Sequence, residues 1–339
     1  MDRTGEFALS PRRDLDEDDV RVRARPGSRP RTRTRPSHVD ARPGMVIGVD
    51  RGRYTCWLDD HEITAMRARE LGRKSVVVGD RVAVVGDVSG GPDALARIVR
   101  IEERRSVLRR TADDDDPYER VIVANADQLV IVTALVDPPP RTGFVDRCLV
   151  AAFDAGVEPL LCLTKADLAP PGAADEFRQH WAALDLRVVT TRRDEEPATL
   201  EERLTGRLSV LIGHSGVGKS TLVNRLVPDA ERAIGGLSAI GKGRHTSTSA
   251  VALALPAGGW VIDTPGVRSF GLAHVSPASV LAGFPDLAPG ATECPPGCEH
   301  RSAAEGCTLD AWVEAGHASP ERLASYRRLL ESRSDLGQS

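Results

Sequence analysis

The sequence contains few aromatic residues and no apolar run long enough to cross a membrane. Phe, Trp and Tyr make up 4% of its 339 residues. The longest apolar stretch, Leu129 to Val136, ends at Asp137, well short of the ~18 residues that a membrane span requires. The N-terminus has no apolar segment of the secretory type, and six cysteines are too few for a disulfide scaffold in a chain of this length. We therefore expect a cytoplasmic protein without a membrane segment.

The charge is nearly balanced, so a wholly basic nucleic-acid coat protein is excluded. Lys and Arg number 45 and Asp and Glu number 49, which gives a net charge of −4. Local basic patches remain compatible with this sum. The length predicts two or three folded units.

The first 43 residues have almost no apolar pattern. An acidic run is followed by closely spaced arginines and prolines, as at Arg29 to Arg35. Such a segment cannot bury enough surface to offset its ordering entropy, so we predict a disordered tail over 1–43. Two interpretations stay open for it, a solvated tail or an arm that follows a phosphate backbone.

Short apolar runs separated by glycines predict a small closed β-barrel over 44–110. Tyr54 and Trp57 in this region either stack on nucleic-acid bases or belong to the core. The expected strands are Met45–Val49, Tyr54–Leu58, Ser75–Val78, Arg81–Val88 and Ala96–Ile101.

Beyond an acidic linker over 111–124, apolar strands alternate with helical patterns over 125–275, which predicts a mostly parallel α/β sheet. The region 276–339 is rich in Pro, Gly and Cys, and it ends in a helix that begins at Ser319-Pro320. The elements expected in the α/β region are strands at Gln128–Leu135, Glu158–Leu163, Leu208–Ile212 and Trp260–Ile262, and helices at Gly143–Gly156 and Phe177–Leu184.

A phosphate-binding loop of the form G-x-x-x-x-G-K-[ST] follows the strand 208–212 and precedes a helical pattern. Its glycines let backbone N–H groups turn toward phosphates, and the helix N-terminus adds positive potential. We expect Lys219 to reach the β- and γ-phosphates and Ser220 to bind Mg²⁺. The nucleotide-binding residues predicted here are Gly213, His214, Ser215, Gly216, Val217, Gly218, Lys219, Ser220 and Thr221.

The motif Asp263-Thr-Pro-Gly266 ends an apolar strand 43 residues after Ser220. Asp263 is predicted to hold Mg²⁺, and the Gly266 N–H to meet the γ-phosphate. The polar stretch 241–249 lies between the two motifs, and a threonine there could bind Mg²⁺ when the γ-phosphate is present. Thr246 and Thr248 are both candidates.

The segment Thr164-Lys165-Ala166-Asp167 is similar to the guanine-binding motif N-K-x-D and follows the strand 158–163. Asp167 would accept hydrogen bonds from the guanine N1–H and amino group, and the Lys165 stem would lie over the ring. Thr164 replaces the usual Asn. The motif precedes the phosphate loop, whereas in most GTPases it follows, so the sheet is predicted to be circularly permuted.

Three cysteines and one histidine, Cys294, Cys298, His300 and Cys307, match a closed tetrahedral Zn²⁺ site. Four protein ligands leave no open position, so this zinc is expected to be structural. Cys56, Cys148 and Cys162 lie in apolar runs and are expected in the core.

Taken together, these motifs resemble the bacterial circularly permuted GTPases of the RsgA (YjeQ) family over roughly residues 45–330. The resemblance implies an OB-like barrel, a permuted P-loop GTPase domain and a small zinc-binding α domain. It also implies GTP hydrolysis with Mg²⁺, stimulated by the small ribosomal subunit, and a role late in the maturation of that subunit. The expected partners are this subunit and its rRNA, and we expect a monomer.

The group that orients the attacking water is not evident, because Val267 follows Gly266 where Ras-like enzymes carry Gln. We therefore expect slow intrinsic hydrolysis, with His245 or the bound partner supplying this group. Two alternative functions are a metabolic P-loop kinase or ATPase and an RNA-binding scaffold with a nearly inactive nucleotide site.

Overall fold

The computed structural model describes residues 38–71, 75–111, 119–182, 184, 186–228, 250–264, 270, 272, 274–302 and 306–334. Most of the predicted tail lies outside these residues, as do His245, Thr246, Thr248 and Gly266. Contacts group 38–339 into one unit. No helix in the described part of this unit is long and apolar enough to cross a membrane.

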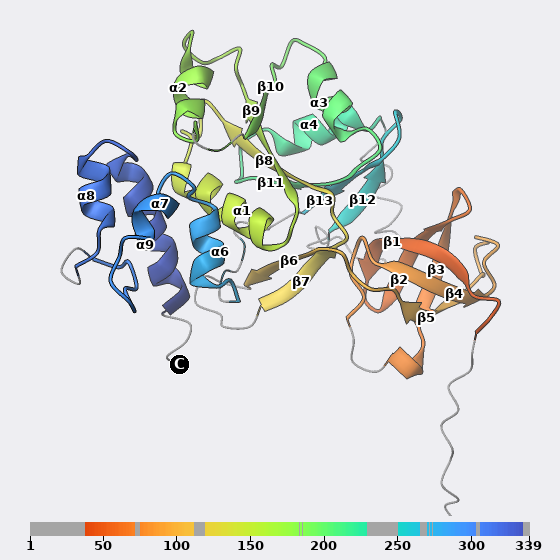
Figure 1. Ribbon diagram of the computed structural model, residues 1–339. Coiled ribbons are helices and arrows are strands. Elements are labelled where there is room, and N and C mark those ends of the chain that lie inside the picture. Colours follow the sequence, from red (N-terminus) through yellow and green to blue (C-terminus); the bar gives the residue numbers. More distant parts are fainter. Residues whose placement is uncertain are drawn as a thin grey trace, which may run out of the picture. The chain divides into compact units, whose positions relative to one another are not determined.

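Five strands form a closed barrel at the N-terminal side of this unit (Figure 1). Their order is β1-β2-β3-β5-β4, and β4 pairs back with β1, so the predicted closed barrel is confirmed. Alternate residues point inward, and Val46, Cys56 and Ile98 are fully buried inside. The strands are β1 (Arg42–Asp50), β2 (Arg53–Leu58), β3 (His61–Arg67), β4 (Arg81–Gly86) and β5 (Ala96–Ile101).

Two details of the barrel differ from the sequence predictions. Strand β3 was not predicted, and the expected strand Ser75–Val78 is absent, since in this stretch only Val78 pairs, in an isolated bridge with Val123. The Asp80 carboxylate accepts a hydrogen bond from the Val77 N–H at 2.8 Å and turns the chain there. Tyr54 is 7% exposed and belongs to the core, so it is not available for base stacking.

A short hairpin connects the barrel to the α/β region. It consists of β6 (Val107–Thr111) and β7 (Glu119–Ala124), which pair antiparallel. Strand β7 therefore occupies the second half of the stretch 111–124, which was expected to be a linker.

The α/β region is a doubly wound sheet in the order β10-β9-β8-β11-β13-β12. All neighbouring pairs in it are parallel except β12 with β13. One face of the sheet packs on α1, and Ile131 and Val210 belong to the core on that side. The other face packs on α3 and α4, and Val132 and Leu211 belong to the core there. The strands are β8 (Gln128–Ala134), β9 (Glu158–Thr164), β10 (Arg187–Thr190), β11 (Leu208–Ile212), β12 (Val251–Ala254) and β13 (Trp260–Asp263); the helices are α1 (Thr142–Asp154), α2 (Ala173–Gln179), α3 (Ala198–Leu204) and α4 (Lys219–Leu226).

Most predicted elements of this region are confirmed, but the helix expected over Phe177–Leu184 is displaced. It begins at Ala173 and ends at Gln179. Trp181 beyond it is buried and donates a hydrogen bond from Nε1 to the Asp146 carboxylate at 2.7 Å. The apolar spacing that predicted the helix therefore reflects packing of a turn onto α1.

Among the residues that the structure describes after the sheet, four further helices are present: α6 (Pro277–Ala282), α7 (Ala288–Ala291), α8 (Leu309–Glu314) and α9 (Pro320–Ser334). Helix α9 begins at Pro320 as predicted, and the Ser319 hydroxyl accepts from the Arg322 N–H at 3.3 Å. Phe284 and Tyr326 join the core on the α1 face, so these helices share it.

One register pair, Gly48 with Val251, joins β1 of the barrel to β12. The two sheets thereby form a single sheet of eleven strands among the described residues. The barrel is consequently hydrogen-bonded to the strand that precedes β13 and Asp263.

Candidate nucleotide-binding and metal-binding sites

The predicted nucleotide-binding residues gather at one edge of the parallel sheet. Thr164 ends β9, Gly213 follows β11 and Asp263 ends β13. All three strands are parallel, because β8 pairs with β9 on one side and with β11 on the other, and β11 pairs with β13. Because the carboxyl ends of parallel strands share an edge, the permuted order of the motifs still brings them together.

The phosphate loop has the backbone that its glycines predict. Gly216 and Gly218 have φ values of +83° and +91°, which L side chains rarely adopt. A Cβ on Gly213 would lie 2.5 Å from the Val132 carbonyl oxygen, so only glycine fits there. Helix α4 begins at Lys219, with Ser220 and Thr221 exposed in its first turn. The loop can therefore direct N–H groups and two hydroxyls at a phosphate.

Lys219 and Asp263 are in direct contact. The Lys219 ammonium lies 2.7 Å from the Asp263 carboxylate and 3.4 Å from the Thr264 carbonyl oxygen, and both charged side chains are largely buried. The Thr264 hydroxyl donates to the Leu211 carbonyl at 2.8 Å, which fixes this end of β13 against β11. A cation and a carboxylate thus stand side by side at the start of α4, where phosphates and Mg²⁺ would be held.

The predicted base-binding segment, 164–167, is anchored to the phosphate loop by Thr164. Its buried hydroxyl donates to the Val217 carbonyl at 2.5 Å. The hydroxyl that replaces the usual amide is therefore engaged within the protein. The two loops are held together by this contact.

Lys165 and Asp167 have partners from two other loops. Lys165 has a φ of +57° and donates a hydrogen bond to the Asp137 carbonyl. The Asp167 carboxylate accepts from the Arg193 N–H at 3.2 Å, and the Ala166 N–H donates to the Thr191 carbonyl at 3.3 Å. The loop after β10 was not predicted as part of the site, although β10 pairs parallel with β9 and therefore brings its following loop to the same edge of the sheet.

His214 of the phosphate loop packs on α1. Its ring lies 4.3 Å from that of Phe144, centre to centre, at 48°. The phosphate loop therefore rests against the first turn of α1, whose Asp146 pairs with Arg322 of α9.

The four predicted zinc ligands lie close enough together to bind one ion. Bond lengths of about 2.3 Å to sulfur and 2.0–2.1 Å to nitrogen place tetrahedral ligand atoms about 3.6–3.8 Å apart. His300 Nδ1 lies 3.4, 3.6 and 3.8 Å from the sulfur atoms of Cys294, Cys298 and Cys307, and Cys294 and Cys307 are 3.9 Å apart. The cluster therefore fits Zn²⁺ in both donor type and spacing.

The surroundings of the cluster favour the metal-binding protonation states of His300 and Cys294. Burial and the nearby Arg327 lower the pKa of His300, which favours the neutral imidazole that binds metals. Burial raises the pKa of Cys294, but hydrogen bonds with Thr308, Cys307 and Cys298 together outweigh it, so the pKa lies below its usual value. Burial raises the pKa of Cys307 to about 11, which only a bound cation would reverse.

The three remaining cysteines are buried, as predicted. Burial raises the pKa of Cys56 and Cys162 to about 12 and raises that of Cys148 further. Thiols in such surroundings are inert core residues.

Comparison with known proteins agrees with this arrangement. The family described as RsgA GTPase matches residues 101–273. The small ribosomal subunit biogenesis GTPase RsgA of Chlorobaculum parvum is 39% identical over 269 residues, which are 77% of this chain and 86% of that protein. Its counterpart from Chromohalobacter salexigens is 39% identical over 266 residues, 76% of this chain and 75% of that protein.

Solved structures show the same fold. The crystal structure of YjeQ from Thermotoga maritima has a TM-score of 0.67 and 25% identity, over 87% of this chain and 99% of that one. The structure of YloQ, described as a circularly permuted GTPase, has a TM-score of 0.64 and 23% identity, over 88% and 97%. The predicted barrel and permuted α/β fold are thereby confirmed.

Proposed function

Because this chain belongs to the RsgA GTPase family, we propose that it binds the small ribosomal subunit, acts late in its maturation, and hydrolyses GTP faster when the subunit is bound. The family membership itself makes the chain a GTP phosphohydrolase. The proposal further includes contact with rRNA, action as a monomer and location in the cytoplasm. The relatives named for small-subunit biogenesis support the partner.

The observation that carries the catalytic part is the contact between Lys219 and Asp263 beside the phosphate loop. We assign Lys219 to the β- and γ-phosphates of GTP, and Ser220 with Asp263 to Mg²⁺. Bound Mg²⁺ would neutralise charge on the phosphates. The Gly266 N–H would meet the γ-phosphate, and Thr246 or Thr248 would complete the magnesium site.

Guanine selection is assigned to the segment 164–167. Asp167 would accept from the base, and the Lys165 stem would cover it. The hydrogen bond from the Lys165 ammonium to the Asp137 carbonyl supports this role, because it ties the end of the side chain to the loop between β8 and α1.

The attacking water needs a group that orients it. Either His245 of this chain or the bound small subunit supplies this group. The apolar Val267 after Gly266 supports slow turnover by the isolated protein. The metabolic-kinase interpretation is excluded by the family assignment, and the intact Lys219 and Asp263 argue against a scaffold with an inactive site.

The proposal is tested by phosphate release from GTP and ATP, with and without purified small ribosomal subunits. We expect stimulation by small subunits, with GTP but not ATP. Lys219→Ala should lower the stimulated rate at least about 100-fold, as loss of a transition-state charge contact does. The matched control Arg178→Ala, an exposed residue of α2, should leave it unchanged.

Each part of the proposal has its own contradicting outcome. Absence of stimulation by subunits would overturn the partner, and equal use of ATP would overturn guanine selection by 164–167. His245→Ala with full stimulated turnover would remove His245 from the mechanism and assign water orientation to the partner.

A further inference from the structure

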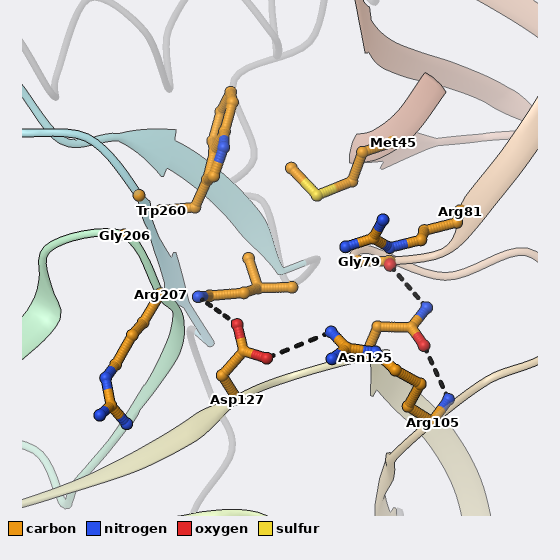
Figure 2. A pocket seen from close by; sticks show the side chains of 11 residues that line it. Met45, Gly79, Arg81, Arg105, Asn125, Asp127, Gly206, Arg207 and Trp260 are labelled. Atoms are coloured by element: carbon orange, nitrogen blue, oxygen red, sulfur yellow. Dashed lines mark hydrogen bonds and ion pairs between the residues drawn. The ribbon is translucent and has the colours of Figure 1, made fainter. Parts of the chain in front are cut away.

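A cavity of about 170 Å³ lies between the barrel and the α/β sheet (Figure 2). Met45 of β1 and Arg81 of β4 line it from the barrel, and Trp260 from the first position of β13. It opens at the amino ends of β11 and β13, whereas the nucleotide-binding residues follow their carboxyl ends. Because β11 has five residues, the two sites are about 15 Å apart. The cavity is therefore separate from the GTP site.

The backbone fixes the cavity. A Cβ on Gly79 would lie 2.0 Å from the Ala124 carbonyl oxygen, so no side chain can fill this wall. The buried Asn125 side chain donates to the Gly79 carbonyl at 2.9 Å and accepts from the Arg105 N–H at 2.8 Å. The wall is thus formed before any ligand binds.

The charge of the cavity is positive. Arg81 and Arg105 are exposed, and the one carboxylate in the lining, Asp127, is held by Arg105 at 3.1 Å and by the Leu208 N–H at 2.9 Å. Within the part of the chain that the structure describes, the Arg81 guanidinium forms no ion pair. Arg207 points away from the cavity, to Glu158. The cavity therefore favours an anion held by Arg81 and Arg105.

An apolar wall stands beside these two cations. Trp260 is half-buried, packs edge-on against Trp57 with ring centres 5.3 Å apart, and lies opposite Met45 (Figure 2). An inorganic anion or an acidic peptide would use the arginines alone and leave this wall exposed. A nucleotide uses both, because its base stacks on an aromatic ring while its phosphates pair with guanidinium groups.

We propose that this cavity binds one nucleotide of single-stranded RNA, with the base between Trp260 and Met45 and the flanking phosphates on Arg81 and Arg105. The site rests on the RNA contact in the proposed function and assigns that contact to named residues. Its occupancy can be measured without ribosomal subunits, so its failure is distinguishable from a failure of subunit-stimulated hydrolysis.

The test is binding of a fluorescein-labelled ten-nucleotide uridine RNA to the full chain over a range of salt concentrations. Arg81→Gln should weaken binding about 5- to 10-fold and reduce the magnitude of the salt slope by about 0.7, the value for one lost phosphate contact on a single strand. Trp260→Leu should weaken binding at least about 5-fold with no change in slope, since stacking releases no counterions. The matched control Arg178→Gln changes an equally exposed arginine of α2 and should alter neither quantity.

The difference between the two variants separates this cavity from non-specific attraction by the arginine-rich segment 1–43, which every variant retains. Thermal unfolding should confirm that each variant is folded. If Trp260→Leu does not fold, the affinity and the salt slope of Arg81→Gln still test the site. GTP hydrolysis without RNA should be unchanged in both variants, because the cavity lies at the opposite ends of the strands.

Two results would overturn the inference. One is binding by Arg81→Gln and Trp260→Leu indistinguishable from that of Arg178→Gln. The other is displacement of the RNA by inorganic phosphate or a polyglutamate peptide, at constant ionic strength, as readily as by unlabelled RNA. A 4-thiouridine probe that crosslinks to peptides containing Met45 or Trp260 would support the site directly, and crosslinks confined to other peptides would oppose it.

Discussion

Arg322 is predicted to contribute strongly to the stability of the C-terminal region. It is 2% exposed, and its guanidinium donates to Asp146 at 2.9 Å, to Asp286 at 2.9 and 3.1 Å and to the Gly283 carbonyl at 3.1 Å. It also lies 4.3 Å from the centre of the Phe284 ring. This one cation joins α1, the turn after α6 and α9.

The expected cost of Arg322→Met follows from what the substitution leaves behind. Both carboxylates remain nearly buried without a counter-ion, and removing one partner of a buried pair destabilises by about 3–5 kcal/mol. Asp146 keeps donors from Trp181 and Ser325, which compensate part of the loss. We therefore expect a loss of about 3 kcal/mol in the free energy of unfolding of this region.

Urea unfolding followed by tryptophan fluorescence measures this loss. Two tryptophans report on the cluster, because Trp181 donates to Asp146 and Trp312 donates to the Asp286 carbonyl at 2.9 Å. The control Arg178→Met removes an exposed pair and should change stability by less than about 0.5 kcal/mol. A loss below about 1 kcal/mol for Arg322→Met would refute the reasoning that a buried charge cluster fastens these helices.

Three further outcomes are expected. Thr164→Val removes the hydroxyl that satisfies the Val217 carbonyl, so the KM for GTP should rise about fivefold, equivalent to about 1 kcal/mol, with kcat little changed. Elemental analysis should find one zinc per chain, and Cys298→Ser should abolish it and lower the unfolding temperature. Burial lowers the pKa of His180, so the unfolded chain binds more protons below pH 6.5, and the free energy of unfolding should fall as pH decreases from there.

Each of these outcomes has a control. Thr190→Val, at an exposed position of β10, should leave the KM unchanged, and an equal rise would show that the Thr164 contact is not specific. Cys162→Ala, in the core, should retain zinc, whereas zinc retained by Cys298→Ser would contradict the ligand assignment. His180→Gln should reduce the slope of the free energy of unfolding against pH below pH 6.5, by at most about 1.4 kcal/mol per pH unit. An unchanged slope would assign the pH dependence to other groups.

The phosphate loop and most of the sheet could be predicted because short-range rules determine them. Gly216 and Gly218 are required by the local backbone, which has a positive φ at both positions. The apolar run Leu208–Ile212 shows the near-continuous hydrophobicity of a strand that is buried on both faces. Order along the chain was sufficient to infer the permutation, because parallel strands bring their carboxyl ends to one edge.

Features that depend on residues far apart in the chain could not be predicted. The false strand at Ser75–Val78 fails because Arg104 binds the Asp80 carboxylate, at 2.7 and 2.9 Å, and holds the turn. Strand β3 was missed because only Ile63 and Ala65 of its seven residues face the core. Asp146 and Arg322 are 176 residues apart, and no periodicity links them.

The permuted order of the strands has a consequence for synthesis of the chain. Strand β8, whose seven residues are all buried in the finished fold, is made together with β9, but its other neighbour β11 ends 78 residues later. At translation rates of 5–20 residues per second, that edge of β8 remains without its partner for about 4–16 s. An unpaired apolar edge is a template for association with other chains, so the growing polypeptide is most vulnerable to aggregation in this interval. The proposed nucleotide site lacks Asp263 until later still, so we do not expect bound nucleotide to protect the chain at that stage.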